Sequence, residues 1–209
     1  KLHNDAEFLR NKRNAEKIKE ALKPYLLEYQ NFIQQNIYLS YRLCNLFKSD
    51  LSQRSKASVE QFGSLIQRDS SFAFEPVLQN QFEQLRQFIE LSIQANYAID
   101  AKNKRFVQSE LKAFKQFFDQ VESTPLTNEQ RVSSIIFEDR NLLVAAAGSG
   151  KTSTIVGKVG YALLTGLYKP EEILVLAFNK NAGEELSERI SFRLKDILSN
   201  FDTSVEALN

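Results

Sequence analysis

Residues 145–154 read AAAGSGKTST and combine two of the chain's seven glycines with a lysine and three consecutive hydroxyl side chains. Glycine tolerates positive φ angles and lets a ligand approach the backbone closely. Where such a turn opens a helix, the exposed N–H groups and the helix dipole bind a polyphosphate. The residue types therefore predict a phosphate-binding turn in which Lys151 contacts the terminal phosphates and Thr152 coordinates magnesium.

The flanking segments have the composition of elements that would position such a turn. Residues 141–147 (NLLVAAA) and 173–178 (ILVLAF) are short apolar runs, typical of buried parallel strands. Each run precedes a segment with helical apolar spacing, and Gly166 is a candidate C-cap of the first of these helices. The order strand, helix, strand, helix predicts a right-handed parallel α/β unit over residues 124–209. The alternative, a plain strand-to-helix turn with a surface lysine, would not explain the adjacent lysine and threonine.

Residues 1–123 have a different character and are predicted to be all-helical, packed as long antiparallel hairpins. Two sets of apolar residues recur at helical spacing, and Pro24 and Pro76 indicate helix starts or breaks. The first set is Leu78, Phe82, Leu85, Ile89 and Ile93, and the second is Val107, Leu111, Phe114, Phe118 and Val121. An aromatic stripe is interpreted as core rather than as a platform for stacking bases: Tyr25, Tyr29, Phe32, Tyr38 and Tyr41. The predicted class is thus α followed by α/β, with domains at 1–123 and 124–209.

Composition limits the function classes further. The formal net charge is +1, so nucleic acid would have to be bound by local contacts rather than by bulk charge. No run approaches the roughly 18 consecutive apolar residues of a membrane span. The single cysteine excludes an internal disulfide and favours a reducing, cytoplasmic compartment. The chain contains no methionine, which predicts a piece of a longer protein.

Three motifs in order resemble superfamily 1 helicases of the UvrD/Rep type. The turn is similar to the A-x-x-G-x-G-K-T loop of that family, since Ala145 stands where the general phosphate loop has glycine. Residues 125–136 (PLTNEQRVSSII) resemble its Q motif, and residues 173–190 (ILVLAFNKNAGEELSERI) resemble its motif Ia. Within the family the resemblance is strongest to the helicase IV group, through the stretches FFDQVESTPLTNEQ and PEEILVLAF.

The resemblance implies a P-loop NTPase (RecA-like) motor domain that uses ATP and Mg²⁺ to translocate on single-stranded DNA and to unwind duplex DNA. Gln130 would recognise adenine, Lys151 would be the catalytic residue, and Thr152 would be the metal ligand. The implied ATP contacts are Gln130, Ala146, Ala147, Gly148, Ser149, Gly150, Lys151, Thr152 and Ser153, and the implied DNA contacts are Phe178, Asn179 and Lys180. The chain departs from the family at Ala146, commonly glycine, and at Asn179-Lys180-Asn181, where the positive charge is displaced by one position.

Hydrolysis in this family also requires an acidic pair after a later strand and arginines from a second motor domain. No such pair follows residue 178, and the chain ends at DTSVEALN. The sequence therefore predicts an incomplete first motor domain that binds nucleotide without turnover, with the remainder of the motor domains as its partner and no membrane partner. Two alternatives remain: another adenine-nucleotide phosphate-loop protein, and a helical interaction module with a degenerate nucleotide domain.

Overall fold

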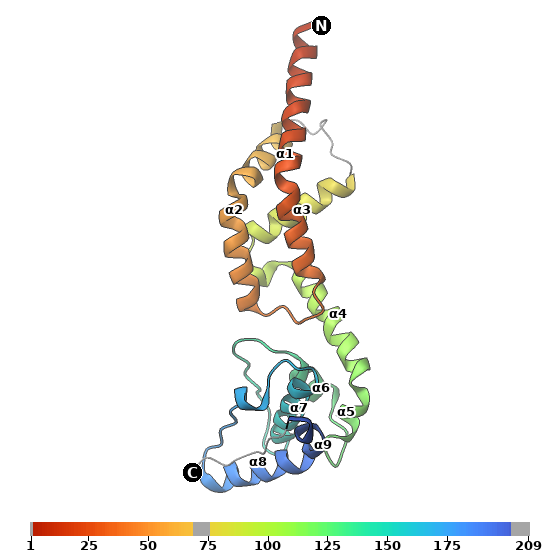
Figure 1. Ribbon diagram of the computed structural model, residues 1–209, viewed down its shortest axis with the longest axis vertical. Coiled ribbons are helices and arrows are strands. Elements are labelled where there is room, and N and C mark those ends of the chain that lie inside the picture. The colour runs from red at the N-terminus through yellow and green to blue at the C-terminus, as the bar shows by residue number, and fades with distance from the viewer. Residues whose placement is uncertain (1, 69–75, 202–209) are drawn as a thin grey trace. The chain divides into compact units, whose positions relative to one another are not determined.

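The computed structural model describes residues 2–68 and 76–201, and the final DTSVEALN lies outside these ranges. The chain divides into two compact units, Lys1–Lys104 and Arg105–Asn209 (Figure 1). The described helices are α1 (Leu2–Gln34), α2 (Tyr41–Arg68), α3 (Pro76–Glu90), α4 (Tyr97–Ala113), α5 (Lys115–Gln120), α6 (Asn128–Ile135), α7 (Lys151–Leu164), α8 (Lys180–Arg193) and α9 (Lys195–Leu198), with 3₁₀ turns η1 (Ile93–Ala95), η2 (Pro170–Glu172) and η3 (Ser199–Phe201).

The first unit is built on a hairpin of α1 and α2, with α3 packed against both helices. Its buried side chains, the first core, come from these three helices, from the α1–α2 connection, from η1 and from the start of α4: Ala15, Leu22, Leu26, Tyr29, Phe32, Leu39, Cys44, Leu51, Val59, Phe62, Phe82, Leu85, Phe88, Ile93 and Ile99. The rings of Phe32 and Phe47 stack with centroids 4.0 Å apart, and Tyr29 lies 5.1 Å from Phe88. The interpretation of the aromatic stripe as core is confirmed for Tyr29 and Phe32, whereas Tyr41 is exposed.

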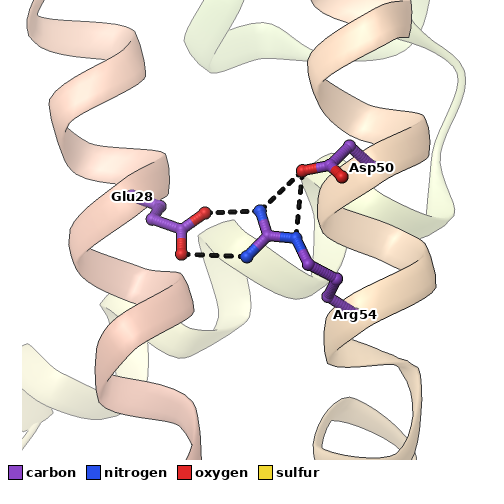
Figure 2. A network of polar contacts seen from close by, with 3 residues as sticks. All are labelled: Glu28, Asp50 and Arg54. Atoms are coloured by element: carbon purple, nitrogen blue, oxygen red, sulfur yellow. Dashed lines mark hydrogen bonds and ion pairs between the residues drawn. The ribbon is translucent and has the colours of Figure 1, made fainter.

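An ion-pair network joins α1 to α2 on the surface of this hairpin (Figure 2). The guanidinium of Arg54 donates two hydrogen bonds to Glu28, at 3.0 and 2.6 Å, and two more to Asp50. The hydrogen bonds from Arg54 hold the pKa of Glu28 below its ordinary value. Because all three side chains remain substantially exposed, the network links the two helices but adds little stability.

The two prolines behave differently. Pro76 is the first residue of α3, as predicted. Pro24, however, lies inside α1, so the prediction of a helix start or break there is wrong. A proline in a helix interior removes one backbone hydrogen bond. Burial of Leu22 and Leu26 on either side of Pro24 in the first core accounts for the continuity of the helix.

In the second unit α6 packs against α7, and α7 contacts α8 and α9. The buried side chains of the second core are Phe118, Val121, Leu126, Ile135, Val156, Tyr161, Leu163, Leu186, Ile190, Leu194 and Leu198. The predicted apolar face from Val107 to Val121 is divided between α4 and α5, because the helix is interrupted at Phe114 (φ −100°, ψ 17°). All five predicted residues nevertheless pack in or against this core. Packing of Val107, Leu111 and Phe114 against the second core also accounts for a unit boundary earlier than the change of sequence character near Ser123.

Neither predicted strand forms within residues 2–68 and 76–201, where the structure assigns no β-strand. Residues 141–147 are exposed throughout. In 173–178 the side chains alternate, since Ile173 and Val175 pack against the second core while Leu174 and Leu176 are exposed. The expected parallel α/β unit is thus corrected to helices joined by extended segments. A strand requires ladder hydrogen bonds to a neighbour, and apolar composition alone does not supply one.

None of the helices in the described ranges combines the length and the apolar character that a membrane span requires.

Candidate functional site

The glycine-rich turn lies directly before α7, as the sequence predicts. Gly148 and Gly150 have φ angles of 76° and 85°, which disfavour any side chain. Gly150 is the N-cap residue of α7, and Lys151 is its first helical residue. The N–H groups of the first helical turn have no acceptor within the helix itself. The turn therefore brings backbone donors, a helix N-terminus and an ammonium group together at one point.

Lys151 and Ser149 contact carbonyl groups of the preceding turn. Lys151 Nζ donates to the oxygens of Ala145 and Ala146, at 3.0 and 2.8 Å. Ser149 Oγ also donates to the Ala146 oxygen, at 2.7 Å. Ala145 and Ala146 are exposed, as is Lys151 itself. The ammonium group thus lies over the turn and within reach of solvent.

Gln130, the predicted adenine contact, links α6 to this turn. The N-cap residue Thr127 and Gln130 form a capping box, in which Gln130 Oε1 accepts from Thr127 N at 2.8 Å. The other end of the side chain, Nε2, donates to the Ser149 oxygen at 3.1 Å. A Cβ atom on Gly150 would lie 2.3 Å from this Nε2 atom. The φ angle therefore favours glycine at position 150, and any larger residue there would also have to displace the end of the Gln130 side chain.

Close packing and side-chain caps hold α7 against α6. A Cβ atom on Gly157 would lie 3.0 Å from Ser134 Oγ of α6 and 2.7 Å from a methyl group of Leu126, which precedes α6, so glycine permits the close contact between the two helices. Lys158 Nζ donates to the carbonyl oxygens of Ser133 and Ile136 at the end of α6, and it lies 3.9 Å from the centroid of the Phe137 ring. Burial lowers the pKa of Lys158 to about 8.

The end of α7 is a Schellman motif, which confirms the predicted role of Gly166. Its φ is 67°, its N–H donates to Leu163, and the N–H of Leu167 donates to Ala162. Near this end the Tyr161 hydroxyl donates to Glu110 at 2.6 Å, which connects α7 to α4. Burial, together with this hydrogen bond, raises the pKa of Tyr161. These contacts therefore hold the middle and the C-terminal end of the helix that begins at the glycine turn.

The three residues predicted to contact DNA lie at the start of α8. The side chain of Phe178 is fully exposed, at 102%. Asn179 is the N-cap residue, and its Oδ1 accepts from Ala182 N at 2.9 Å. Lys180 is exposed and lies 3.9 Å from Glu184. An aromatic ring and an ammonium group are thus presented to solvent, while the asparagine side chain is used to cap the helix.

Sequence reasoning missed a buried carboxylate that pairs with α8 through an arginine that also contacts α7. Glu122, whose side chain is 3% exposed, accepts from Arg189 Nε at 3.0 Å, and its other oxygen lies 3.2 Å from Arg193 Nε. Arg189 also donates to Ser153 Oγ at 3.0 Å, in the first turn of α7. No local pattern marks Glu122, because Arg189 lies 67 positions away along the chain.

Comparison with known proteins finds a family that this part of the chain resembles. Residues 126–204 match the family model of the UvrD/REP helicase N-terminal domain. The resemblance to superfamily 1 helicases of the UvrD/Rep type is thus confirmed over the segment that contains the turn, α7 and α8.

Several individual relatives are named DNA helicases. The chain is 44% identical over 92 residues to DNA helicase IV of Escherichia coli (strain K12), which covers 44% of this chain and 14% of that protein. It is 34% identical over 65 residues to DNA helicase II of Rickettsia typhi, covering 31% of this chain and 10% of that protein. It is 36% identical over 66 residues to ATP-dependent DNA helicase Rep of Buchnera aphidicola, covering 29% of this chain and 10% of that protein. The chain therefore spans one seventh or less of the length of these relatives, and no solved structure matches it significantly.

Proposed function

We propose that this chain contributes the nucleotide-binding start of an ATP-dependent DNA helicase. The observation that carries the proposal is the turn at Gly148 and Gly150, which places Lys151 at the N-terminus of α7 and lies within hydrogen-bonding distance of Gln130. Such a turn suits a polyphosphate, because glycine leaves the backbone donors accessible and the helix dipole favours negative charge. The match to the UvrD/REP model over residues 126–204 supports the same assignment.

The residues of the turn fit ATP and Mg²⁺ as follows. Backbone groups of residues 146–150 would surround the phosphates, Lys151 would neutralise the terminal phosphate, and Ser153 would lie beside them in the first helical turn. The partly exposed Thr152 hydroxyl would supply one oxygen ligand to magnesium. Gln130 would recognise adenine through its amide, which can both donate and accept. Bound magnesium would offset phosphate charge in the transferred group.

For DNA we propose the exposed start of α8. Phe178 would stack on a base of a single strand, and Lys180 would contact a phosphate. Asn179 contributes by fixing the first turn of α8 through its cap. In the complete protein, alternating ATP binding and hydrolysis would move this surface along single-stranded DNA and separate a duplex.

The extended segments 141–147 and 173–178 would become strands of the motor sheet when the remaining motor domain is present. Leu142, Val144, Leu174 and Leu176 are all between 66 and 89% exposed, which is unusual for side chains of this size. Strands of parallel sheets are buried on both faces, and this apolar composition fits that environment. Sequences outside the matched part of the relatives would supply the neighbouring strands.

The first prediction tests nucleotide binding directly. Replacement of Lys151 by alanine should weaken binding of a fluorescent Mg²⁺–ATP analogue by about tenfold or more, because a charge-assisted contact to phosphate is lost. Fluorescence anisotropy measures the affinity, and Lys195→Ala, an exposed lysine on α9, is the control that should leave it unchanged.

Unlabelled ATP should displace the analogue better than GTP, and the 209-residue chain should release no phosphate. Equal affinity of Lys151→Ala and the unaltered chain would contradict the proposed site. Equal displacement by ATP and GTP would favour a phosphate-loop protein of another class. Phosphate release in proportion to the amount of the chain would contradict the expected lack of turnover.

A further inference from the structure

The buried carboxylate of Glu122 contacts α8, the helix whose start the proposed function assigns to DNA, and one of its partners there, Arg189, also contacts α7. Its side chain is only 3% exposed, whereas Arg189 and Arg193 on α8 are 33 and 27% exposed. A buried carboxylate is costly to desolvate unless charged donors compensate for the lost water. Here two guanidinium groups of one helix converge on one carboxylate that precedes α6.

The two oxygens of Glu122 are not equally satisfied. Oε1 accepts from Arg189 Nε at 3.0 Å and lies 2.9 Å from its NH2 group. Oε2 lies 3.2 Å from Arg193 Nε but has no aligned hydrogen bond among the described residues. Glu122 is therefore held mainly through Arg189, whose position determines how well this carboxylate is compensated.

Arg189 also reaches α7. Its NH2 group donates to Ser153 Oγ at 3.0 Å, two residues after Lys151. Since Lys151, Thr152 and Ser153 share the first turn of α7, a displacement of this turn would change the contact to Arg189. Arg189 lies on the same helix as Asn179 and Lys180, which define the start of α8.

We propose, on the basis of the proposed function, that Glu122 is a positioning residue that couples nucleotide binding at α7 to DNA binding at the start of α8. The carboxylate fixes the guanidinium group of Arg189 in an orientation in which it donates both to Glu122 and to Ser153 Oγ. A nucleotide that orders the first turn of α7 then orders α8 and the Phe178–Lys180 segment through these bonds. Coupling of this kind is reciprocal, so DNA also raises the affinity for nucleotide.

The experiment compares the 209-residue chain with Glu122→Gln, which retains the shape but removes the charge. Arg189→Lys serves as a second variant, because lysine keeps the charge but lacks a fork that bonds both partners. The control is Glu188→Gln, the same change at an exposed position of α8. Binding of the fluorescent Mg²⁺–ATP analogue is measured with each variant, and binding of labelled oligo-dT is measured with and without a non-hydrolysable ATP analogue.

We expect the nucleotide to raise the affinity for oligo-dT by about fivefold or more in the unaltered chain and in Glu188→Gln. In Glu122→Gln and Arg189→Lys the coupling factor, which is the ratio of the oligo-dT affinities with and without the ATP analogue, should fall to near one. The affinity for the nucleotide alone should change by less than the coupling factor does. A role confined to stability would lower both affinities together and leave the coupling factor in place.

Hydrogen exchange provides a second measurement that does not depend on ligands. Without any nucleotide, Glu122→Gln should accelerate amide exchange in α8 by roughly tenfold or more, as expected when the charge of a buried acceptor that faces two guanidinium groups is removed. Unchanged exchange in α8, or an unchanged coupling factor, would overturn the inference. If the unaltered chain binds nucleotide but shows no coupling, the inference fails while the proposed function stands; if it binds no nucleotide, the proposed function itself fails.

Discussion

Gln130 serves the fold through both ends of its amide. The oxygen accepts from Thr127 N and completes the capping box of α6, and the nitrogen donates to Ser149 in the glycine turn. Recognition of adenine needs the same two atoms, so the proposed role requires the side chain to exchange partners. The sequence motif predicted the adenine contact alone, because a one-dimensional pattern does not reveal that Ser149 lies within 3.1 Å.

Two substitutions at Gln130 separate these roles. Gln130→Glu retains the acceptor for Thr127 N and loses only the donor to the Ser149 oxygen, so the free energy of unfolding should fall by about 0.5 kcal/mol, whereas Gln130→Ala loses both contacts and should cost about 1 kcal/mol or more. Both variants should lose the preference for ATP over GTP in competition assays. Urea denaturation measures the stability difference, and a retained ATP preference in Gln130→Glu would contradict the adenine assignment.

At the scale of elements, helices were more predictable than strands. The apolar spacing before Gly166 and along residues 182–197 identified α7 and the α8–α9 pair, because helical hydrogen bonds are local. It did not reveal the breaks at Phe114 and Leu194, which depend on packing. The segments 141–147 and 173–178 have strand composition but no ladder, since pairing depends on neighbours that the local sequence does not specify.

The close packing of α7 predicts opposite effects of the same substitution in two helices. A Cβ atom on Gly160 would lie 2.6 Å from Phe117 Cζ and 2.9 Å from Leu194 Cδ2, whereas one on Gly63 of α2 would meet nothing within 4 Å. Gly160→Ala should therefore lower the free energy of unfolding by up to ~2 kcal/mol, as overpacking outweighs helix propensity. Gly63→Ala should raise it by about 0.5–1 kcal/mol.

Chemical denaturation followed by circular dichroism measures both variants. Stabilisation by Gly160→Ala would mean that the rings and methyl groups around α7 move aside at little cost, and that the tight contact is not required.

At the scale of the whole molecule, each unit has a core of its own. The first core is centred on the aromatic cluster around Phe88, and the second includes Phe118 and Tyr161, whose rings lie 6.1 Å apart. The sequence indicated two parts through the change near Ser123. The division at Lys104 could not be predicted, because it depends on which core buries the apolar side of α4.

Separate cores predict separately localised effects of core truncation. Phe88 and Phe118 are both fully buried, so replacement of either by alanine should cost about 3–5 kcal/mol. Phe88→Ala should reduce hydrogen-exchange protection in α1–α3, and Phe118→Ala should reduce it in α6–α8. Equal loss of protection in both units from one substitution would show instead that the chain unfolds as a single cooperative body.

The contacts of Lys151 with the Ala145 and Ala146 carbonyl groups have a consequence for anion selectivity. A small monovalent anion that approaches the ammonium group must replace two carbonyl acceptors that are already part of the chain. It would form only one contact with a single negative charge in their place. A chain of phosphates brings several oxygens and more than one negative charge, so it displaces both carbonyl groups at once. A turn of this kind would therefore favour anions with a higher total charge and more acceptor oxygens, and ordinary cellular salt would be a poor competitor for it.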